Sequence, residues 1–531
     1  MHYLSHSNDL GPTIMANKTL FAATHGPRLP PVNTFNRAGA GAYDYFPKHK
    51  LAQYAATGCL SNTFYASADE QLAVVLELAQ ELEPEFLGKA ALYARRQAHM
   101  KDVPALLLAV LSTRNTDTLK KVFPQVIDNG RMLRNFVQIM RSGVVGRKSL
   151  GSVPKVLVRQ WLDTATDRAL IDAAVGTSPS LKDVVRMVHP KPTDASREAF
   201  YGWLLGKPHL FERLPRTLRE LKLFELDRSR EVPDVPFQML TALQLNAQQW
   251  AQVALQGGWH MLRMNLNTFA RQGVFVVPGV VEAIREKLTS REAIRRARVL
   301  PYQLLIAHRS LHPDVPKELR NVLEKALEIA LENVPRFHGR VAVCPDVSGS
   351  MSSPVTGRRK SASSAVRCID VAALIATAVM KKNPGTEVLP FAEHVRTVSL
   401  SPRDSVMTSA HLLASFGGGG TNCSAPLEWL LKTGTPAELV ILVSDNQSWI
   451  DARHHGTSRT LQQWSLFRKR NPQAKLVCVD LQPYGTTQAA ERTDVLNVGG
   501  FSDEVFEIVR LFARDELSAH HGVGQIEAVK V

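Results

Sequence analysis

The chain has 531 residues, 44% of them hydrophobic, and this length predicts two or three domains rather than one core. Its formal net charge of +15 favours a polyanionic partner such as nucleic acid. No run approaches the roughly 18 apolar residues of a membrane helix, and the N-terminus lacks the apolar core of a signal peptide. The five cysteines are odd in number and lack zinc-ligand spacing, so we expect a reducing, cytoplasmic location and no membrane partner.

The basic excess lies in the first part of the chain. Residues 1–340 contain 45 Lys and Arg against 31 Asp and Glu, a net +14, whereas residues 341–531 contain 19 against 18, a net +1. Residues 131–191 alone hold 11 basic and 4 acidic residues, a net +7. A polyanion-binding surface is therefore predicted in the first part only.

The first 340 residues have the pattern of successive short helices. Turn signals such as "DNG" (128–130), "SGVVG" (142–146) and "HPKP" (189–192) separate them, and "SADE" (67–70) predicts a capping box from Ser67 to Glu70. We expect HEAT-like stacked helical pairs over residues 1–338, with about the first 20 residues as a tail. Helical spacing of apolar residues occurs in "PALLLAVLS", "RMLRNFVQIMR", "PKVLVRQWLD", "SLKDVVRMV", "REAFYGWLLG", "PFQMLTALQL" and "ELRNVLEKALEIALENV".

After "PRFHGR" (335–340) the pattern changes to apolar strands that alternate with helices. Strands are predicted in "VAVCPDVS", "TEVLPFA", "ELVILVSD" and "KLVCVDL", and helices in "CIDVAALIATAVMKK", "SAPLEWLLKTG" and "SDEVFEIVRLFA". Fully apolar strands between helices indicate a parallel sheet that is covered on both faces. Residues 339–531 should therefore form a Rossmann-like, doubly wound α/β domain.

Three segments of this second domain place oxygen-bearing side chains after a strand or in a glycine-rich loop. They are "PDVSGSM" (345–351), "FGGGGTN" (416–422) and "LVILVSDN" (439–446). "PDVSGSM" alone could be an ordinary polar loop, but ligands of such sheets bind beyond the carboxyl ends of the strands. Two carboxylates and three hydroxyls suit Mg²⁺, which prefers hard oxygen ligands. The predicted metal ligands are Asp346, Ser348, Ser350, Thr421 and Asp445.

These three motifs resemble the metal-ion-dependent adhesion site of von Willebrand factor A domains. In the first part, "GAGAYDYFPKHKLAQYAATGCLSNTFYAS", "SLKDVVRMVHPKP" and "RARVLPYQLLIA" resemble the TROVE module. The two together resemble the Ro autoantigen family and its bacterial members, over about residues 30–515. This resemblance implies a closed ring of helical repeats with a basic central hole. It also implies that Y-type noncoding RNAs bind the outer face and that single-stranded ends of misfolded RNAs bind in the hole.

The candidate RNA-binding residues are basic side chains of the first part. In "RMLRNFVQIMR" the arginines share the polar face of an amphipathic helix, where guanidinium groups would suit phosphates, although a solvated surface helix has the same pattern. The family uses a histidine that matches His189 in Y RNA contact, and a cation at a helix C-terminus is the alternative for it. The last three residues could line a hole or lie on an exposed helix. The candidates are Arg131, Arg134, Arg141, Arg147, Lys148, Lys155, Lys182, Arg186, His189, Lys191, Arg295, Arg296 and Arg298.

The sequence therefore predicts a non-enzymatic RNA-binding protein of noncoding RNA quality control or processing, with Mg²⁺ as its cofactor. Phosphate contacts would dominate, and no DNA sequence readout is expected. The resemblance implies a 3′-to-5′ exoribonuclease such as polynucleotide phosphorylase as a partner. One alternative is a metal-dependent protein-adhesion scaffold with incidental RNA binding. A metal-dependent phosphohydrolase is the other, but the five predicted ligands include no evident general base and "GGGGTN" lacks the Lys of a phosphate loop.

Overall fold

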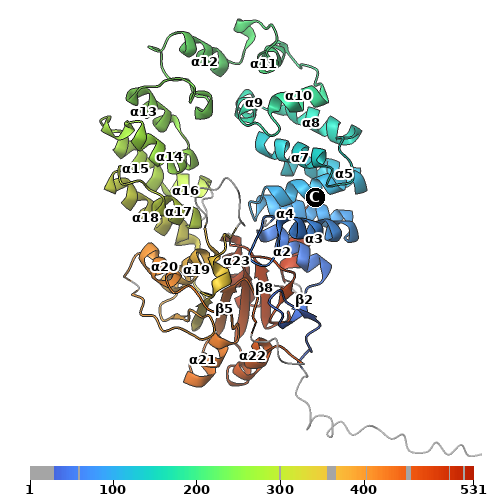
Figure 1. The fold of residues 1–531 in the computed structure, drawn as a ribbon, viewed down its shortest axis with the longest axis vertical. Helices are drawn as coiled ribbons and strands as arrows, with labels where there is room; N and C mark the ends of the chain where they lie inside the picture. Colours follow the sequence, from blue (N-terminus) through green and yellow to red (C-terminus); the bar gives the residue numbers. More distant parts are fainter. Residues whose placement is uncertain are drawn as a thin grey trace, which may run out of the picture.

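The computed structural model describes residues 29–57, 60–297, 301–355, 366–401, 403–449, 456–501, 503–517 and 521–531. Two arms of helices rise from a C-terminal domain and meet at the top (Figure 1). The first arm contains α2 (Pro47–Thr57), α3 (Ala68–Glu81), α4 (Pro84–Arg96), α5 (Asp102–Arg114), α6 (Thr116–Val126), α7 (Gly130–Ser142), α8 (Ser152–Thr164), α9 (Asp167–Ala174) and α10 (Leu181–Val188).

The top and the second arm complete the helical part. The top contains α11 (Ala195–Leu205), η1 (Phe211–Arg213) and α12 (Arg216–Leu226) (Figure 1). The second arm descends to the C-terminal domain. It contains η2 (Phe237–Met239), α13 (Ala247–Gln256), α14 (Trp259–Arg271), η3 (Val274–Val276), α15 (Val280–Thr289), α16 (Arg291–Ala297), α17 (Pro301–Arg309), α18 (Lys317–Ala330) and η4 (Leu331–Asn333).

Local sequence signals fix many of these helices. The predicted capping box of α3 is present: Ser67 Oγ accepts from the Glu70 N–H, and the Glu70 carboxylate accepts from the Ser67 N–H at 2.7 Å. Helix α7 begins at the Asn129 cap and ends at Gly143, which has a φ of 86°. Its apolar face packs inward, with Phe136 against Phe123 at a ring distance of 5.2 Å.

The helix predicted in "PFQMLTALQL" is wrong. Residues 236–245 form only the three-residue η2 followed by turns. Leu240 is the one fully buried residue of this stretch after Pro236, and its other large apolar side chains pack on the core only partly buried. Helical spacing of apolar residues alone therefore does not suffice to form a helix here.

The C-terminal domain is built on a five-stranded parallel sheet of order β4-β3-β5-β6-β8. Val341 and Val343 face one hydrophobic core, and Ala342 and Cys344 face another, so both sides of the sheet are covered. The predicted doubly wound fold is confirmed. Its elements are β3 (Val341–Pro345), η5 (Gly349–Ser352), α19 (Cys368–Lys382), β4 (Glu387–Val388), α20 (Val406–Ala414), α21 (Ala425–Thr433), β5 (Leu439–Ser444), α22 (Arg459–Arg470), β6 (Lys475–Asp480), β7 (Thr486–Thr487), β8 (Val495–Gly499), α23 (Asp503–Ala513) and α24 (His521–Glu527).

The N-terminal segment joins the second domain through strand pairing. Strands β1 (Thr34–Phe35), β2 (Gly41–Asp44) and β7 form a small antiparallel sheet. At the other end of the chain, α24 packs against α2 and α4. The chain leaves η4 and enters β3 on either side of the predicted boundary at 338/339, while the predicted N-terminal tail lies outside the described residues.

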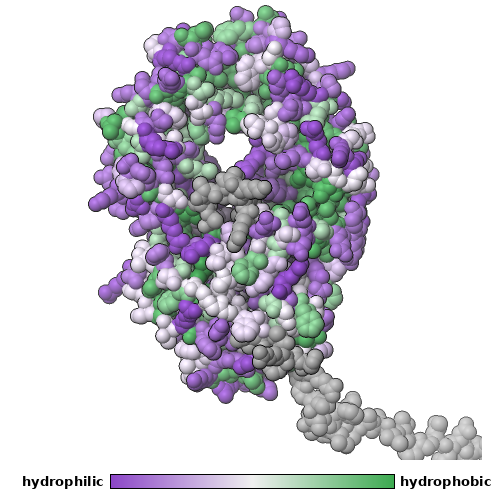
Figure 2. All heavy atoms as spheres, viewed as in Figure 1, coloured by the Kyte–Doolittle hydropathy of each residue, from purple (hydrophilic) through white to green (hydrophobic). Residues whose placement is uncertain are grey.

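The C-terminal domain completes the ring. Helix α2 packs against β8 and α24 at the foot of one arm, and α17 and α18 pack against α19 and α20 at the foot of the other. Figure 2 shows the opening that the arms enclose. Arg168 of α9 also joins the arms through an ion pair of 2.8 Å with Asp234. Among the described helices, none is long and apolar enough to cross a membrane.

Candidate functional site

The two predicted metal carboxylates lie at neighbouring strand ends. Asp346 follows β3 and Asp445 follows β5, and these strands pair in parallel, with Pro345 opposite Val443. In the strand order β4-β3-β5-β6-β8, the chain turns one way from β3 to β4 and the other way from β5 to β6. The crevice at such a switch point is where α/β sheets bind ligands.

Backbone hydrogen bonds bring the glycine-rich loop to the same place. The Gly349 N–H donates to the Gly419 carbonyl and the Gly418 N–H to the Val347 carbonyl, both at 2.9 Å. The Trp449 N–H, four residues after Asp445, donates to the Thr421 carbonyl at 3.2 Å. A Cβ on Gly420 would lie 1.9 Å from the Trp449 indole nitrogen, so this close approach requires glycine.

All five predicted metal ligands are brought together and buried. The Ser348 N–H donates to Asp346 Oδ1 at 2.8 Å, and the Ser348 and Ser350 hydroxyls lie 3.3 Å apart. None of the five is more than 5% exposed. The turn that begins at Asp346 is therefore an ordered cluster of oxygens rather than a solvated polar loop.

The electrostatics of this cluster favour a cation. Burial raises the pKa of Asp346, and hydrogen bonds from Ser348 and Ser444 partly oppose this. Burial, followed by the charge of Asp346, raises the pKa of Asp445 to about 7. Asp445 Oδ2 is buried and has no hydrogen-bond partner among the described residues. Two neighbouring carboxylates and an unpaired buried oxygen are costly unless a positive charge compensates them.

The donor set fits Mg²⁺. Within the described ranges, no three His, Cys, Asp or Glu side chains gather as a metal site, so the ligands here would be two carboxylates, the three hydroxyls and water. An all-oxygen set of this kind suits a hard dication and not zinc. Asp346, Ser348 and Ser350 would hold it from one loop, with Thr421 and Asp445 opposite.

Two buried residues at this sheet edge were not predicted. Ser444, the last residue of β5, donates to Asp346 Oδ2 at 2.6 Å. Asp480, the last residue of β6, is a third buried carboxyl, and burial and then Asp445 raise its pKa. "KLVCVDL" ends a strand with an acid just as "ELVILVSD" does, and that likeness could have indicated Asp480.

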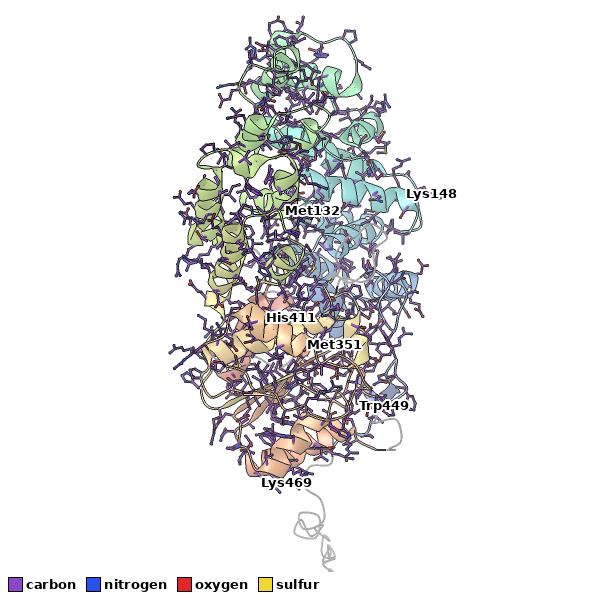
Figure 3. The ribbon with its side chains drawn as sticks, turned by 60° about the vertical axis from the view of Figure 1, so that its left-hand side comes forward. Met132, Lys148, Met351, His411, Trp449 and Lys469 are labelled. Carbon is purple, nitrogen blue, oxygen red and sulfur yellow. The ribbon has the colours of Figure 1, made fainter. Side chains whose placement is uncertain are left out.

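The structure places ten of the predicted RNA-binding residues on the first arm. They lie on α7, on α8, on α10, which packs against both α7 and α8, or on the turns that follow α7 and α10. Five of these cations are exposed and have no carboxylate within salt-bridge distance among the described residues: Arg131, Arg141, Lys148, Arg186 and Lys191. Figure 3 shows Lys148 at the outer edge of the molecule.

Two of the predicted arginines are instead held inside the arm. Arg134 is half-buried against Gly176, where a Cβ would lie 1.7 Å from the guanidinium. Burial, and then the charge of Arg131, lowers its pKa. Arg147 donates to the Ser112 hydroxyl at 2.8 Å and to the Ser112 carbonyl. These two side chains are positioned to hold the helices together rather than to meet a polyanion.

The remaining candidates have mixed positions. Lys155 and Lys182 are half-buried on α8 and α10, and His189 is the exposed C-cap of α10 with a φ of 49°. Arg295 and Arg296 lie on α16 of the opposite arm, where Arg296 pairs with Glu292. The structure does not bring Arg295 and Arg296 next to the ten candidates of the first arm. Arg298 lies outside the described residues.

Comparisons with known proteins identify relatives of the chain. Residues 340–513 match the family model of the Ro60 vWA domain. The chain is 25% identical to a Deinococcus radiodurans protein named RNA-binding protein RO60, over 91% of this chain and 95% of that one. A Caenorhabditis elegans protein of the same name is 23% identical over 45% of this chain and 37% of that one.

A solved structure supports the fold. The crystal structure of the D. radiodurans Ro (RSR) protein matches with a TM-score of 0.60 and 22% identity, over 89% of this chain and 100% of that one. The mostly helical first part and the parallel sheet of the second part are common to both. The predicted resemblance and the predicted fold class are confirmed.

Proposed function

We propose that this chain, which is similar to a protein named RNA-binding protein RO60 and whose own residues 340–513 match the Ro60 vWA domain, binds RNA through its first helical arm. The observation that carries the proposal is the set of exposed cations on α7, α10 and the turns after them. None of them forms a salt bridge among the described residues, and Asp183 is the one carboxylate whose pKa Arg141 and Arg186 are seen to lower. Unpaired cations on rigid helices suit phosphates because no ion pair must be broken first. Both relatives are named as RNA-binding proteins, which supports RNA as the polyanion.

Contact with phosphates would make the binding largely independent of base sequence. Arg131 and Arg141 lie on α7 and Arg186 on the adjacent α10, so a backbone could cross the two helices. His189 caps the C-terminal end of α10, three residues after Arg186. A structured noncoding RNA of the Y type, recognised by shape, is the partner that this surface suits.

The opening of the ring suits a different part of an RNA. It lies between the two arms of helices (Figure 1), and a single strand is narrower than a duplex. We infer that single-stranded 3′ ends of misfolded or precursor RNAs thread into it, and that the chain acts in noncoding RNA quality control in the cytoplasm. It would do so without catalysis of its own, alongside a 3′-to-5′ exoribonuclease such as polynucleotide phosphorylase.

The C-terminal domain would bind one Mg²⁺ at Asp346, Ser348, Ser350, Thr421 and Asp445. Among the described residues, Asp445 Oδ2 has no hydrogen-bond partner and no Lys or Arg contributes to the pKa shift of either aspartate, which supports a bound cation. A role as an adhesion scaffold would require a partner's carboxylate to reach these oxygens. Their burial argues against that alternative for the structure described here.

The test uses the full chain, because residues 29–45 pack on the C-terminal domain and a helical fragment would lose that contact. RNA that copurifies with the protein from cells is sequenced, and the binding of a recovered RNA is measured over a salt series. We expect small structured RNAs and an affinity that falls steeply with salt. Binding that ignores salt would overturn the phosphate-contact model.

A further inference from the structure

The buried metal cluster has a cover that comes from the helical part of the chain. Tyr65 lies in the connection between α2 and α3, and its ring meets the ring of Tyr484 edge to face at 5.6 Å. Tyr484 follows β6 and donates to Gln482 Oε1 at 2.9 Å. Tyr484 lies beyond the end of β6, where Asp480 stands opposite Ser444, the donor to Asp346, so the Tyr65 ring lies at the sheet edge that carries the cluster. Burial, and then the charge of Asp445, raises the pKa of Tyr65 to about 12, and a hydrogen bond with Ser350 partly opposes this.

The described part of this connection, residues 60–67, is itself fixed. The Thr63 N–H donates to the Ala66 carbonyl at 2.9 Å, and the Gln71 side chain donates to the Ser61 carbonyl at 3.2 Å. The Ala68 N–H donates to Asn62 Oδ1 at 2.7 Å. These bonds attach the loop to the first turn of α3, next to its capping box.

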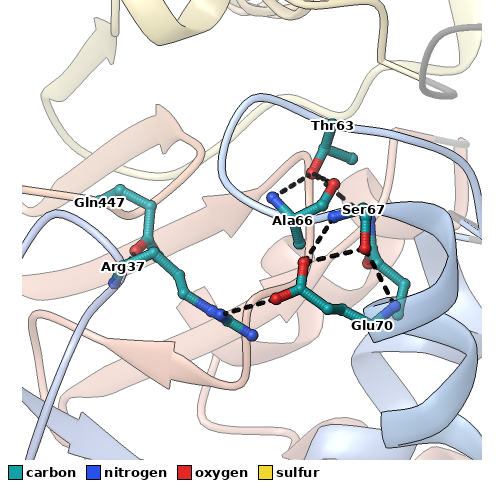
Figure 4. A network of polar contacts seen from close by, with 7 residues as sticks. Arg37, Thr63, Ala66, Ser67, Glu70 and Gln447 are labelled. Carbon is teal, nitrogen blue, oxygen red and sulfur yellow. Dashed lines mark hydrogen bonds and ion pairs between the residues drawn. The ribbon is translucent and has the colours of Figure 1, made fainter.

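A second set of contacts ties this region to the loop after Asp445. Asn36 donates to the Ser448 carbonyl at 2.6 Å, and the Arg37 N–H donates to Gln447 Oε1 at 2.8 Å. The Arg37 guanidinium reaches Glu70 of the capping box at 3.7 Å. Figure 4 shows Arg37 between Gln447 of the C-terminal domain and Glu70 of the helical part. The turn between β1 and β2 therefore holds the loop after Asp445 and the start of α3 together.

We propose that Tyr65 covers the metal centre, so that the chain itself, and not an external carboxylate, closes the open side of a bound cation. The inference rests on the metal site proposed above. It follows that a cation and the docked position of the α2–α3 connection stabilise each other, because each favours the same arrangement. Tyr65 acts here as a positioning residue that controls access of water and ligands.

The test uses Mn²⁺ as the probe, bound to the full chain at the centre. Water-proton relaxation reports how freely water reaches the ion, and stopped-flow chelation with EDTA reports how fast the ion leaves. In wild type we expect weak relaxation enhancement, slow release and no effect of added acetate. In Tyr65→Ala we expect stronger enhancement, sensitivity to acetate and release about tenfold faster, since a hydrogen bond and an aromatic contact are lost.

Two further variants separate covering from folding. Tyr65→Phe keeps the ring on Tyr484 and removes only the hydroxyl, so the relaxation should remain as in wild type while release quickens a few-fold. Tyr201→Phe on α11 is the matched control, because its buried hydroxyl has no hydrogen-bond partner among the described residues. This control variant should change neither the water-proton relaxation nor the rate of Mn²⁺ release.

The outcomes distinguish this inference from the metal site beneath it. If wild type binds no Mn²⁺, both proposals fail. If Mn²⁺ binds and Tyr65→Ala shows the same relaxation and release as wild type, the cover is disproved and the metal site stands. If Tyr65→Ala lowers thermal stability, the Tyr65→Phe release rate decides: a rate equal to wild type would overturn the role of the hydroxyl.

Discussion

Replacing Asp445 by Asn should stabilise the metal-free protein and destabilise the protein in Mg²⁺. Asp445 is fully buried beside Asp346, with one oxygen unpaired among the described residues. Without a cation, its charge is opposed both by burial and by its neighbour. Asn has the same shape and no charge, so the variant removes this cost together with one charged metal ligand.

The size of the effect follows from the pKa. That of Asp445 rises from 3.8 to about 7 in the folded protein, and each unit corresponds to about 1.36 kcal/mol, so the shift corresponds to about 4 kcal/mol. Because the folded state binds the proton more tightly, this contribution is fully present below pH 4 and is lost as the pH rises towards 7. Asp346, whose pKa is also raised by burial, acts in the same direction.

Urea unfolding at pH 5 and pH 8, each in EDTA and in Mg²⁺, provides the assay. In EDTA the urea midpoint of wild type should be lower at pH 8 than at pH 5. The urea midpoint of Asp445→Asn should decrease much less over the same change in pH. Mg²⁺ should restore wild type at pH 8 and leave the variant unchanged. Two results would refute the reasoning. One is an equal decrease in urea midpoint from pH 5 to pH 8 for both proteins in EDTA, and the other is a variant less stable than wild type at pH 8 in EDTA.

Asp494 supplies a control of opposite sign in the same domain. It accepts from Trp464 Nε1 at 2.9 Å and pairs with Arg468 and Arg492 at 3.0 Å. Burial alone would raise its pKa, but these partners hold the pKa below its usual range. Its contribution is therefore present above its unfolded pKa and lost as the pH falls. Asp494→Asn should destabilise the protein at pH 8 in EDTA and in Mg²⁺ alike.

Three further predictions concern RNA and the metal. Replacing Arg131, Arg141 and Arg186 by Gln should weaken RNA binding and lower the log–log salt slope by about 0.7 to 0.9 per lost phosphate contact, measured by filter binding. Lys469→Gln, at an exposed position of α22 in the C-terminal domain, should leave that slope unchanged. A structured RNA with a single-stranded 3′ end should bind more tightly than the same fold with a blunt end at one salt concentration, and equal affinities would argue against threading. Asp346→Ala should abolish the heat of Mg²⁺ binding in calorimetry and leave the RNA salt slope intact, since the exposed cations lie in the other part.

The parts of the fold that could be predicted are those whose residues are buried mainly by apolar packing. Helix α19 has the predicted bounds, 368–382, since almost every residue from Cys368 to Met380 is buried under the sheet and its neighbours. Helix α22 and strand β8 were not foreseen. The first buries few residues, Trp464 among them, on an otherwise polar helix, and the second carries the buried Asn497, which bonds to Thr487. Polar groups satisfied by distant partners leave no mark on local periodicity.

The distinction between local sequence pattern and distant contacts also applies to the metal site and the RNA-binding residues. The five metal oxygens could be predicted because the carboxyl ends of parallel strands meet at one edge. Tyr65 could not, since its contacts lie hundreds of residues away in the chain, as do those of Asn36 with Ser448. Amphipathic spacing identified the polar face of α7 but could not separate exposed Arg131 from Arg134, which Gly176 holds in place.

These long-range contacts bear on how the two parts act together. Tyr65 lies between α2 and α3, at the foot of the first arm, and α2 packs on β8 of the sheet that carries the metal centre. A cation beneath Tyr65 would favour the docked position of this foot, and an RNA that contacts both arms would favour the same closed ring. Coupling of this kind is reciprocal. The factor by which the cation raises the affinity for such an RNA must equal the factor by which the RNA raises the affinity for the cation. An RNA held only by α7 and α10 should leave the affinity for the cation unchanged.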